Sequence, residues 1–268
     1  MIDVLVRGGG DLASGAVLRM ARAGFRVLVT ELPQPLAVRR TVSFAQAVYD
    51  GGISIESISA QLVATKEEAD LCFRQNMVGV IVDPSCTCLE WFRADVIIDA
   101  RMAKQYYRQE VRSGVLQVGL GPGFIVGENC DVVIETMRGP HLGRAIWDGA
   151  AEKDTGEPDS VRGFQAERVL RSPSAGEIQT HCKIGDHVDQ GQVIAEIGGA
   201  VVIAPFSGMI RGLLQNGLKI VSGVKIGDLD PRDDPSLCFL VSDKALAVGG
   251  GVMDAIMSNP DLRRQINA

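Results

Sequence analysis

The sequence predicts an α/β protein with a Rossmann-like, mostly parallel sheet over residues 1–160, a small all-β domain over 161–235 and a helical tail over 236–268. Three observations support this fold class. The chain opens with a strand, a glycine turn, a helix and a second strand in direct succession. Continuous Val and Ile runs follow, which are typical of strands covered on both faces. Beyond a turn-rich linker at 154–160, glycine turns recur at a fixed spacing.

The opening strand, turn and helix carry the clearest functional signal. The turn matches the pattern G-x-G-x-x-A and consists of Gly8, Gly9, Gly10, Asp11, Leu12 and Ala13. Glycines at these places let the backbone approach a ligand, and bare amides at the start of a helix favour an anion. Glu31 ends the second strand, where a carboxylate can accept a hydrogen bond from a ribose hydroxyl.

This unit therefore predicts nucleotide-type binding, with two simpler interpretations left open. The glycines can serve only a tight strand-to-helix turn, and Asp11 can serve only as the helix N-cap. As part of a phosphate site, Asp11 would repel the ligand unless Arg7 or a divalent ion neutralises its charge.

Composition limits the partners and the compartment. The chain has 268 residues, 46% of them apolar, and a net charge of −6, so it is long enough for two domains with separate cores. Since no long basic block and no apolar run of membrane-spanning length occurs, we expect neither nucleic acid nor a membrane as partner. We expect a cytoplasmic protein whose six cysteines are thiols. Cys86 and Cys88 form the one close pair, which leaves a redox or soft-metal role open without predicting a metal site.

Polar and glycine-rich turns follow two of the later predicted strands. Asp99 and Arg101 come after the apolar run at 96–98, and Gly121 and Gly123 come after the run that ends at Val118. Because ligands of open parallel sheets bind outside the carboxyl ends of the strands, we expect these turns to meet the first glycine turn around one cavity. The second glycine turn can form an anion nest, or its glycines can serve turn geometry alone.

Several charged residues are candidates for binding and proton transfer. The anion-binding candidates are Arg39, Arg40, Arg138 and Arg144. The first two follow a proline-rich loop after the second strand, and the others lie in a polar, glycine-rich segment at 135–144, where Glu135 and His141 are candidates for moving a proton. Guanidinium groups bind phosphate and carboxylate oxygens in pairs, although they also form solvated or structural ion pairs.

Residues 168–231 repeat a pattern at a spacing of 32 positions, as between Pro173 and Pro205. Short strands with repeated glycine turns indicate two β units related by a pseudo-twofold axis. The pattern resembles the barrel-sandwich hybrid fold of biotinyl and lipoyl domains, which carry a lysine on the hairpin that joins their halves. The join at 198–203 contains no lysine, so we expect this domain to pack or dock rather than to act as a carrier.

Four segments together resemble the YqeB-type accessory proteins of selenium-dependent molybdenum hydroxylases. They are residues 7–15, 30–40, 119–124 and 135–144, of which 30–40 is the most specific. The resemblance extends over nearly the whole chain and implies a role in maturing or activating those hydroxylases. It also implies a first domain similar to the Rossmann domain of XdhC-type factors, which insert and modify the molybdenum cofactor. It transfers no catalytic residue, and Cys86 and Cys88 are not part of the pattern.

We therefore expect a maturation factor whose partner is a selenium-dependent molybdenum hydroxylase and which binds a phosphorylated cofactor or nucleotide at the strand ends. The expected ligand is the molybdenum cofactor or a dinucleotide. Two alternatives are an NAD(P)-dependent oxidoreductase with Glu31 on the ribose, and a non-catalytic docking scaffold. The sequence leaves open whether turnover occurs and whether the chain forms a homo-oligomer.

Overall fold

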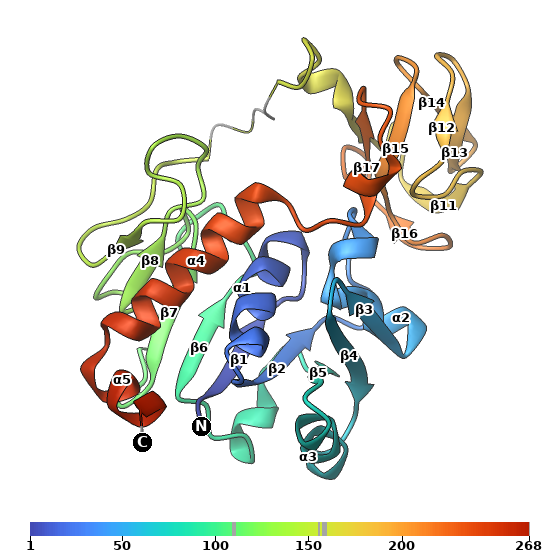
Figure 1. The fold of residues 1–268 in the computed structure, drawn as a ribbon. Coiled ribbons are helices and arrows are strands. Elements are labelled where there is room, and N and C mark those ends of the chain that lie inside the picture. The colour runs from blue at the N-terminus through green and yellow to red at the C-terminus, as the bar shows by residue number, and fades with distance from the viewer. Residues whose placement is uncertain (109–110, 155, 157–159, 268) are drawn as a thin grey trace. The chain divides into compact units, whose positions relative to one another are not determined.

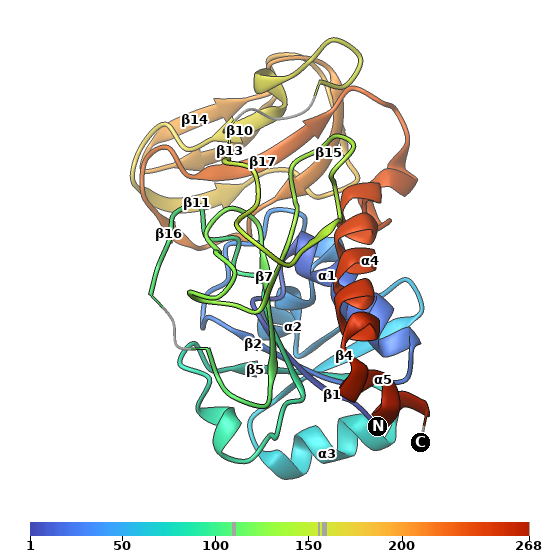
Figure 2. The same ribbon diagram turned by 90° about the vertical axis from the view of Figure 1, so that its left-hand side faces the viewer.

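The computed structural model describes residues 1–108, 111–154, 156 and 160–267. The chain forms two compact units whose sequence ranges are interleaved (Figures 1 and 2). The first unit consists of Met1–Pro35, Ser43–Asp154 and Val241–Ala268, and the second consists of Leu36–Val42 and Thr155–Leu240. Of the linker predicted at 154–160, residues 155 and 157–159 lie outside the described residues.

The first unit is built on a nine-stranded sheet with the strand order β3-β4-β5-β2-β1-β6-β7-β8-β9. The strands are β1 (Asp3–Arg7), β2 (Arg26–Glu31), β3 (Gly52–Ile55), β4 (Ile58–Val63), β5 (Val78–Val82), β6 (Val96–Asp99), β7 (Leu116–Leu120), β8 (Val132–Ile134) and β9 (Ala145–Ile146). The seven inner strands, from β4 to β8 across the sheet, run parallel to one another. The outer strands β3 and β9 pair antiparallel with their neighbours. The middle of the sheet is apolar on both faces, and Val4, Leu5 and Val6 of β1 are fully buried.

Helices of this unit are α1 (Asp11–Arg22), α2 (Ala47–Asp50), α3 (Lys66–Arg74), α4 (Asp243–Ser258) and α5 (Pro260–Asn267), with short 3-10 helices η2 (Phe44–Gln46) and η3 (Thr87–Glu90). Two reciprocal hydrogen bonds cap the first turn of α3. The Thr65 hydroxyl accepts a hydrogen bond from the amide of Glu68, and the Glu68 carboxylate accepts one from the amide of Ala64. In Figure 1, α1 and α4 lie side by side over the same face of the sheet.

The α1–α4 contact explains the glycines of the C-terminal tail. A Cβ atom on Gly15 of α1 would lie 1.9 Å from the carbonyl oxygen of Ala245, and one on Gly249 of α4 would lie 2.3 Å from the carbonyl oxygen of Gly15. The two helix backbones therefore touch. α4 runs without a break through Gly249–Gly251, and Gly249 serves the close packing of the two helices.

The second unit contains two antiparallel four-stranded sheets with the orders β10-β17-β15-β12 and β14-β13-β11-β16. Its strands are β10 (Val169–Arg171), β11 (Gly176–Thr180), β12 (His187–Val188), β13 (Val193–Ile197), β14 (Ala200–Ile203), β15 (Gly208–Leu213), β16 (Lys219–Ile220) and β17 (Lys225–Asp230), and its 3-10 helices are η1 (Arg40–Val42), η4 (Ala166–Arg168) and η5 (Pro235–Cys238). The sequence repeat supplies the core, because the matched positions Ile178 and Ile210, like Ile194 and Ile226, are fully buried.

The predicted fold class, a Rossmann-like mostly parallel sheet followed by a barrel-sandwich domain of biotinyl or lipoyl type, is wrong. The structure instead has a large mixed sheet and two antiparallel sheets. Among the described residues, the connections from β6 to β7 and from β7 to β8 contain no helix, so the sheet lacks regular crossover helices on that side. Hydrophobic periodicity indicates where strands occur but not the direction of their partners. The apolar residues at 53–55 and 58–63 therefore predicted strands without revealing that β3 and β4 form a hairpin.

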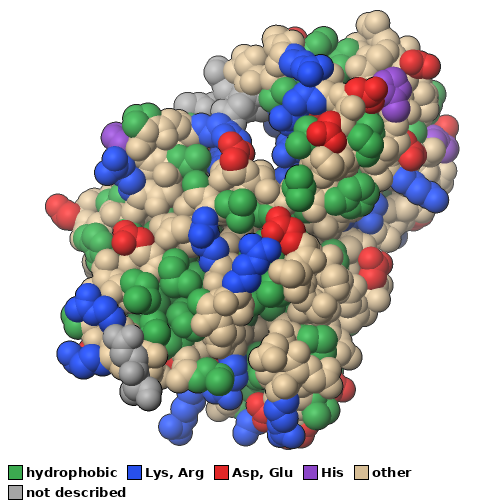
Figure 3. Space-filling view, in the orientation of Figure 1, with side chains coloured by type: hydrophobic (Ala, Val, Ile, Leu, Met, Phe, Trp, Pro, Cys, Tyr) green, Lys and Arg blue, Asp and Glu red, His purple; other side chains and the backbone are tan. Residues whose placement is uncertain are grey.

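The surface carries charges of both signs. On the face shown in Figure 3, lysine and arginine side chains are interspersed with acidic ones. None of the described helices is long and apolar enough to cross a membrane.

Candidate functional site

The first glycine turn lies at the carboxyl end of β1 and leads directly into α1. Gly8 adopts a positive φ of 88°, and its amide donates to the carbonyl oxygen of Thr30 at 2.8 Å. This conformation favours glycine because an L side chain is strained there. The next two glycines face different surroundings, and they give the turn a supported side and an open side.

Gly9 forms the supported side. A Cβ atom here would lie 2.8 Å from the amide nitrogen of Ala45 and 3.0 Å from the side chain of Val29. The amide of Ala45 donates to the Gly9 carbonyl at 2.9 Å, and the amide of Phe44 donates to the Ser14 hydroxyl at 3.3 Å. The segment after β2 therefore holds the turn from behind.

Gly10 forms the open side. It is the N-cap of α1 with ordinary backbone angles, φ −68° and ψ −178°, and a Cβ atom on it would meet nothing within 4 Å. Ala13, in the first turn of α1, is buried. The amides and the dipole at the start of α1 favour an anion on this side, whereas the carboxylate of Asp11 in the same turn opposes one.

Glu31 holds the turn through its side chain. One carboxylate oxygen accepts a hydrogen bond from the Gly9 amide at 2.7 Å, and the other accepts one from the Leu32 amide at 2.8 Å. Glu31 is therefore bound to the turn itself, and its predicted contact with a ribose stays a prediction.

Asp99, at the end of β6, gathers two cations and a phenol. Its buried carboxylate lies 3.1 Å from Nη1 of Arg7 and 2.6 Å from Nη2 of Arg101, and it accepts a 2.6 Å hydrogen bond from the hydroxyl of Tyr107. The Arg101 guanidinium also lies over the Tyr107 ring, 4.8 Å from its centroid. Arg7 and Arg101 therefore place two guanidinium cations on this carboxylate beside the glycine turn.

Two pKa shifts follow from this arrangement. Burial, together with the hydrogen bond to the Asp99 carboxylate, raises the pKa of the Tyr107 phenol above its usual value. Burial alone lowers the pKa of Arg101, but the hydrogen bond and charge of Asp99 outweigh this effect and raise it. Tyr107 is therefore held as a neutral hydrogen-bond donor and Arg101 as a cation.

The second glycine turn lies against the residues that follow β6. A Cβ atom on Gly121 would lie 3.0 Å from the Thr136 hydroxyl and 3.4 Å from Met102, and one on Gly123 would lie 2.6 Å from Ala103. A Cβ atom on Gly8 would lie 3.5 Å from Arg101. The structure therefore brings the two glycine turns, Asp99 and Arg101 together at the carboxyl ends of β1, β6, β7 and β8.

The predicted proton-transfer residues have separate surroundings. Glu135 is 2% exposed, and its two carboxylate oxygens accept hydrogen bonds from the amides of Met137 at 2.6 Å and Glu152 at 2.8 Å. His141 is exposed, with Nδ1 3.1 Å from the carboxylate of Glu152. Glu135 thus holds the backbone of its own loop, while His141 lies on the loop surface.

The four candidate arginines belong to two different units. Arg138 makes two 2.8 Å bonds to Asp243 at the start of α4, and the Nε of Arg144 donates to the carbonyl of Pro140 at 3.2 Å. Arg39 and Arg40 belong to the second unit. The Nε of Arg40 donates to the carbonyl of Leu213 at 2.7 Å.

Tyr107 and Thr136 were not predicted as site residues. Tyr107 lies in an irregular segment without hydrophobic periodicity, so the only available signal was its short separation from Asp99. Thr136 directly follows Glu135 and was predicted only as part of the polar segment.

The described residues contain no group of three or more His, Cys, Asp or Glu side chains that could hold a metal ion. The six cysteines are free and buried. Burial and the nearby Asp83 raise the pKa of the Cys88 thiol well above its usual value, which opposes formation of a reactive thiolate.

The fold and the site together define an α/β protein with a mixed sheet whose parallel strands end at a glycine turn, a helix N-terminus and a cationic Asp99 group. No family model matches the chain. The chain is similar to the uncharacterized protein YqeB of Escherichia coli K12, with 44% identity over 254 residues, covering 95% of this chain and 47% of that protein. This match supports the predicted resemblance to YqeB-type proteins. The chain spans about half the length of this curated relative.

Solved structures with some likeness to the chain come from another group of proteins. An aspartoacylase family protein of Mesorhizobium loti is 11% identical with a TM-score of 0.27, covering 85% of this chain and 84% of that one. The ectoine utilization protein EutE of Ruegeria pomeroyi is 12% identical with a TM-score of 0.25, covering 84% and 85%. A succinylglutamate desuccinylase of Silicibacter is 16% identical with a TM-score of 0.25, covering 85% and 84%.

These comparisons give no support to part of the prediction. The three neighbours are described as aspartoacylase, ectoine utilization and succinylglutamate desuccinylase proteins, and not as Rossmann proteins or as selenium, molybdenum-cofactor or hydroxylase accessory factors. The Rossmann descriptor is corrected by the mixed sheet of the structure, and none of these descriptions supports the molybdenum-hydroxylase descriptors. With TM-scores this low, the neighbours supply no activity for the chain.

Proposed function

We propose that the first unit binds a phosphorylated small molecule, such as a nucleotide or a phosphorylated cofactor, at the carboxyl ends of its parallel strands. The observation that carries this proposal is the open face of Gly10 at the start of α1, next to the cationic group of Arg7, Asp99 and Arg101. Backbone amides at a helix start and guanidinium groups are both common donors to phosphate oxygens in proteins.

The neighbouring contacts support a rigid site. Gly9 is held by Ala45 from behind and by Glu31 from the side, and Asp99 fixes the two arginines. A ligand would therefore meet donors that are already oriented, and little conformational entropy would be lost on binding.

Gly10 offers a direct test, because its side of the turn is open and its backbone angles suit any residue. We expect Gly10→Glu to weaken the binding of ADP or NAD by about 30-fold, since one added negative charge near a phosphate costs about 2 kcal/mol when partly screened. Gly10→Gln has the same size without the charge, and it separates repulsion from steric blocking. Titration calorimetry should be run with and without Mg²⁺, because the charge of Asp11 opposes a phosphate.

We expect the wild type to bind the nucleotide most tightly, Gly10→Gln to bind it less tightly and Gly10→Glu to bind it most weakly. The proposal is wrong if wild-type protein binds none of ADP, NAD and a molybdopterin dinucleotide at millimolar concentration. It is also wrong if Gly10→Glu binds a ligand as tightly as Gly10→Gln does.

The maturation role and the hydroxylase partner rest on the sequence resemblance alone and stay predictions. Co-purification of the full chain with a molybdenum hydroxylase, compared between wild type and Gly10→Glu, tests them separately from ligand binding. Loss of co-purification only in the variant would link the ligand to the partner.

A further inference from the structure

We infer that strand β14 of the second unit is a dimerisation edge, which pairs antiparallel with β14 of a second copy of this chain. The strand (Ala200–Ile203) is the first in the order β14-β13-β11-β16. One of its sides is paired with β13, and in the described part of the chain no strand pairs with the other side. The inference is independent of the ligand proposed for the first unit.

The backbone of β14 offers hydrogen-bonding groups on its outer side. In an antiparallel pair, the N–H and C=O groups of alternate residues point to the partner strand. Just after β14, the amide of Ala204 donates to the carbonyl of Gln192 at 2.9 Å, and the carbonyl of Ala204 accepts from the amide of Gly191 at 2.8 Å. Ala204 therefore faces the β13 side. By alternation, the backbone groups of Val201 and Ile203 face the outer side, where no described backbone group bonds them.

The side chains on the exposed face of this edge are apolar. Val201 is 55% exposed and Ile203 is 50% exposed, and Val193, which lies opposite Ile203 on β13, is 38% exposed. Val202, between the first two, is buried in the core. Because side chains alternate along a strand, Val193, Val201 and Ile203 share one face of the sheet. A strand added at the outer side of β14 would therefore bury apolar surface in addition to forming backbone hydrogen bonds.

Among the described edge strands of this unit, β14 is the one that lacks a charged or polar side chain. Exposed polar residues lie on the other three, which are Arg171 on β10, His187 on β12 and Lys219 on β16. In contrast, every residue from 198 to 206 is glycine, proline or another apolar residue. Charged side chains on edge strands oppose the addition of a further strand in native proteins. The edge of β14 is therefore the one suited to accept a strand.

A second copy of β14 is the partner that this charge pattern fits. An uncharged edge offers no complementary charge to an acidic or basic peptide, whereas two copies related by a twofold axis oppose only apolar residues. If Val202 lies opposite Val202 of the second copy, Val201 lies opposite Ile203, and these two residues exchange N–H···O=C bonds in both directions. Glu196 lies opposite Val201 on β13, one strand spacing further from the twofold axis, so the carboxylates of the two copies are kept apart.

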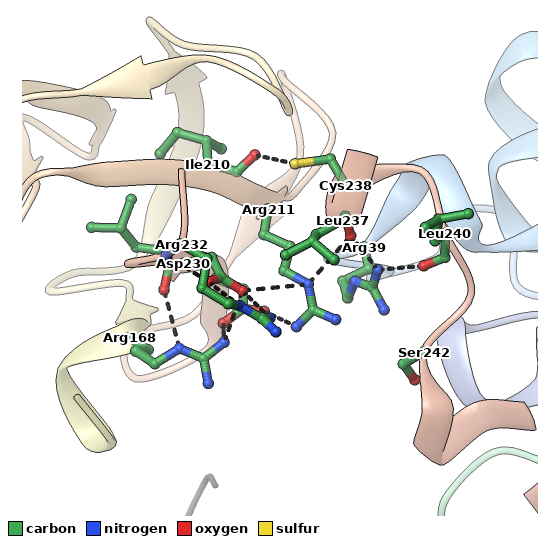
Figure 4. A network of polar contacts seen from close by, with 12 residues as sticks. Arg39, Arg168, Ile210, Arg211, Asp230, Arg232, Leu237, Cys238, Leu240 and Ser242 are labelled. Carbon is green, nitrogen blue, oxygen red and sulfur yellow. Dashed lines mark hydrogen bonds and ion pairs between the residues drawn. The ribbon is translucent and has the colours of Figure 1, made fainter. Parts of the chain in front are cut away.

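The rest of the second unit is braced, so the edge is held in a fixed position. Figure 4 shows Arg211 of β15 and Arg232 directed at Asp230, at the end of β17. Arg232 binds the Asp230 carboxylate through bonds of 2.9 and 2.6 Å, and the Nε of Arg211 lies 3.8 Å from it. In the sheet that contains β14, Ile194 and Ile197 of β13 are fully buried. Pairing at β14 therefore requires little further ordering of the chain.

The short length of the edge predicts a weak dimer. Stable protein interfaces bury about 1,200 to 2,000 Å², and a strand of 4 residues covers less. We expect a dissociation constant on the order of 10 to 100 µM. In sedimentation equilibrium of the full chain between about 1 and 500 µM, the weight-average mass should rise from that of one chain towards that of two.

Val201→Lys tests the edge directly. We expect it to raise the dissociation constant about tenfold or more, because a lysine on an edge strand opposes pairing. Val221→Lys is the matched control, since Val221 is 65% exposed and directly follows β16 at the opposite edge of the same sheet. It should change the dissociation constant less than about twofold. Both side chains are exposed, and thermal unfolding followed by circular dichroism checks that both variants are folded.

A mixture of Val201→Lys chains with Ile203→Glu chains tests the register. The proposed pairing sets the two substituted positions opposite each other, so the mixture should associate about threefold more tightly than either variant alone. A mixture that associates no more tightly than its components overturns the antiparallel pairing. The dimerisation edge is overturned if the wild type stays monomeric up to about 500 µM, if Val201→Lys associates as tightly as the wild type, or if Val221→Lys weakens association as much as Val201→Lys does.

Discussion

The glycines of α4 predict substitutions of opposite sign at neighbouring positions. In Gly249→Ala the new Cβ would lie 2.3 Å from the carbonyl oxygen of Gly15, which is about 1 Å closer than an ordinary contact. In Gly250→Ala the nearest atoms belong to the Arg19 side chain at 3.8 Å, an ordinary contact. Both changes add the same group to the same helix, so they differ only in what the Cβ meets.

We expect Gly250→Ala to raise the free energy of unfolding by about 0.5 to 1 kcal/mol, because alanine favours the helix. Gly249→Ala has the same gain but forces α1 and α4 apart, at a cost of about 1 to 3 kcal/mol. Its net effect should be a loss of about 1 to 2 kcal/mol. Urea-induced unfolding followed by circular dichroism measures both. If Gly249→Ala stabilises the protein as much as Gly250→Ala does, the two helix backbones are not in contact and the packing argument fails.

Three further predictions concern single groups of the first unit. Asp83 accepts hydrogen bonds from the amide of Cys88 at 2.7 Å and from the hydroxyl of Thr87 at 3.1 Å. Burial alone raises the pKa of Asp83, but these hydrogen bonds outweigh burial and bring the pKa below its usual value of 3.8. Asp83→Asn should therefore cost about 1 to 2 kcal/mol at neutral pH, and this difference should vanish as the pH falls well below 3.8 in acid-unfolding curves. Burial raises the pKa of Cys88, so native protein should resist alkylation at this thiol when digests are analysed by mass spectrometry; rapid labelling would contradict its burial. The exposed pair of Arg138 and Asp243 should contribute only about 0.2 to 1 kcal/mol in a double-mutant cycle, and less at high salt.

Local patterns in the sequence predicted the elements better than their arrangement. The apolar run before Gly8, the helical spacing after it and the strand that ends at Glu31 were predicted correctly, because each signal lies within a few consecutive residues. The antiparallel pairing of β3 with β4, and of β9 with β8, depends on the direction of the neighbouring strand, which hydrophobic periodicity does not report. Local patterns also do not report contacts between segments far apart in the sequence. The 36–42 segment was therefore assigned to the first domain, although the amide of Leu213 in the second unit donates a hydrogen bond to the carbonyl of Val38.

The candidate site was predicted in part for similar reasons. Glycine patterns indicated both turns, but they could not distinguish Gly9, which is enclosed by Ala45, from Gly10, which is open. Glu31 was predicted as a ligand contact, whereas its carboxylate binds the amides of Gly9 and Leu32. The sequence alone could not show that the Glu31 carboxylate binds these amides, and its contact with a ligand stays a prediction.

The measurement that tests the central claim most directly is the crystal structure of the full chain soaked with the nucleotide that binds most tightly. We predict electron density for a phosphate group against the amides at the start of α1, on the open side of Gly10 and within reach of Arg7 or Arg101. A well-ordered nucleotide bound elsewhere, with no density above residues 8–13, would contradict this account of the first unit.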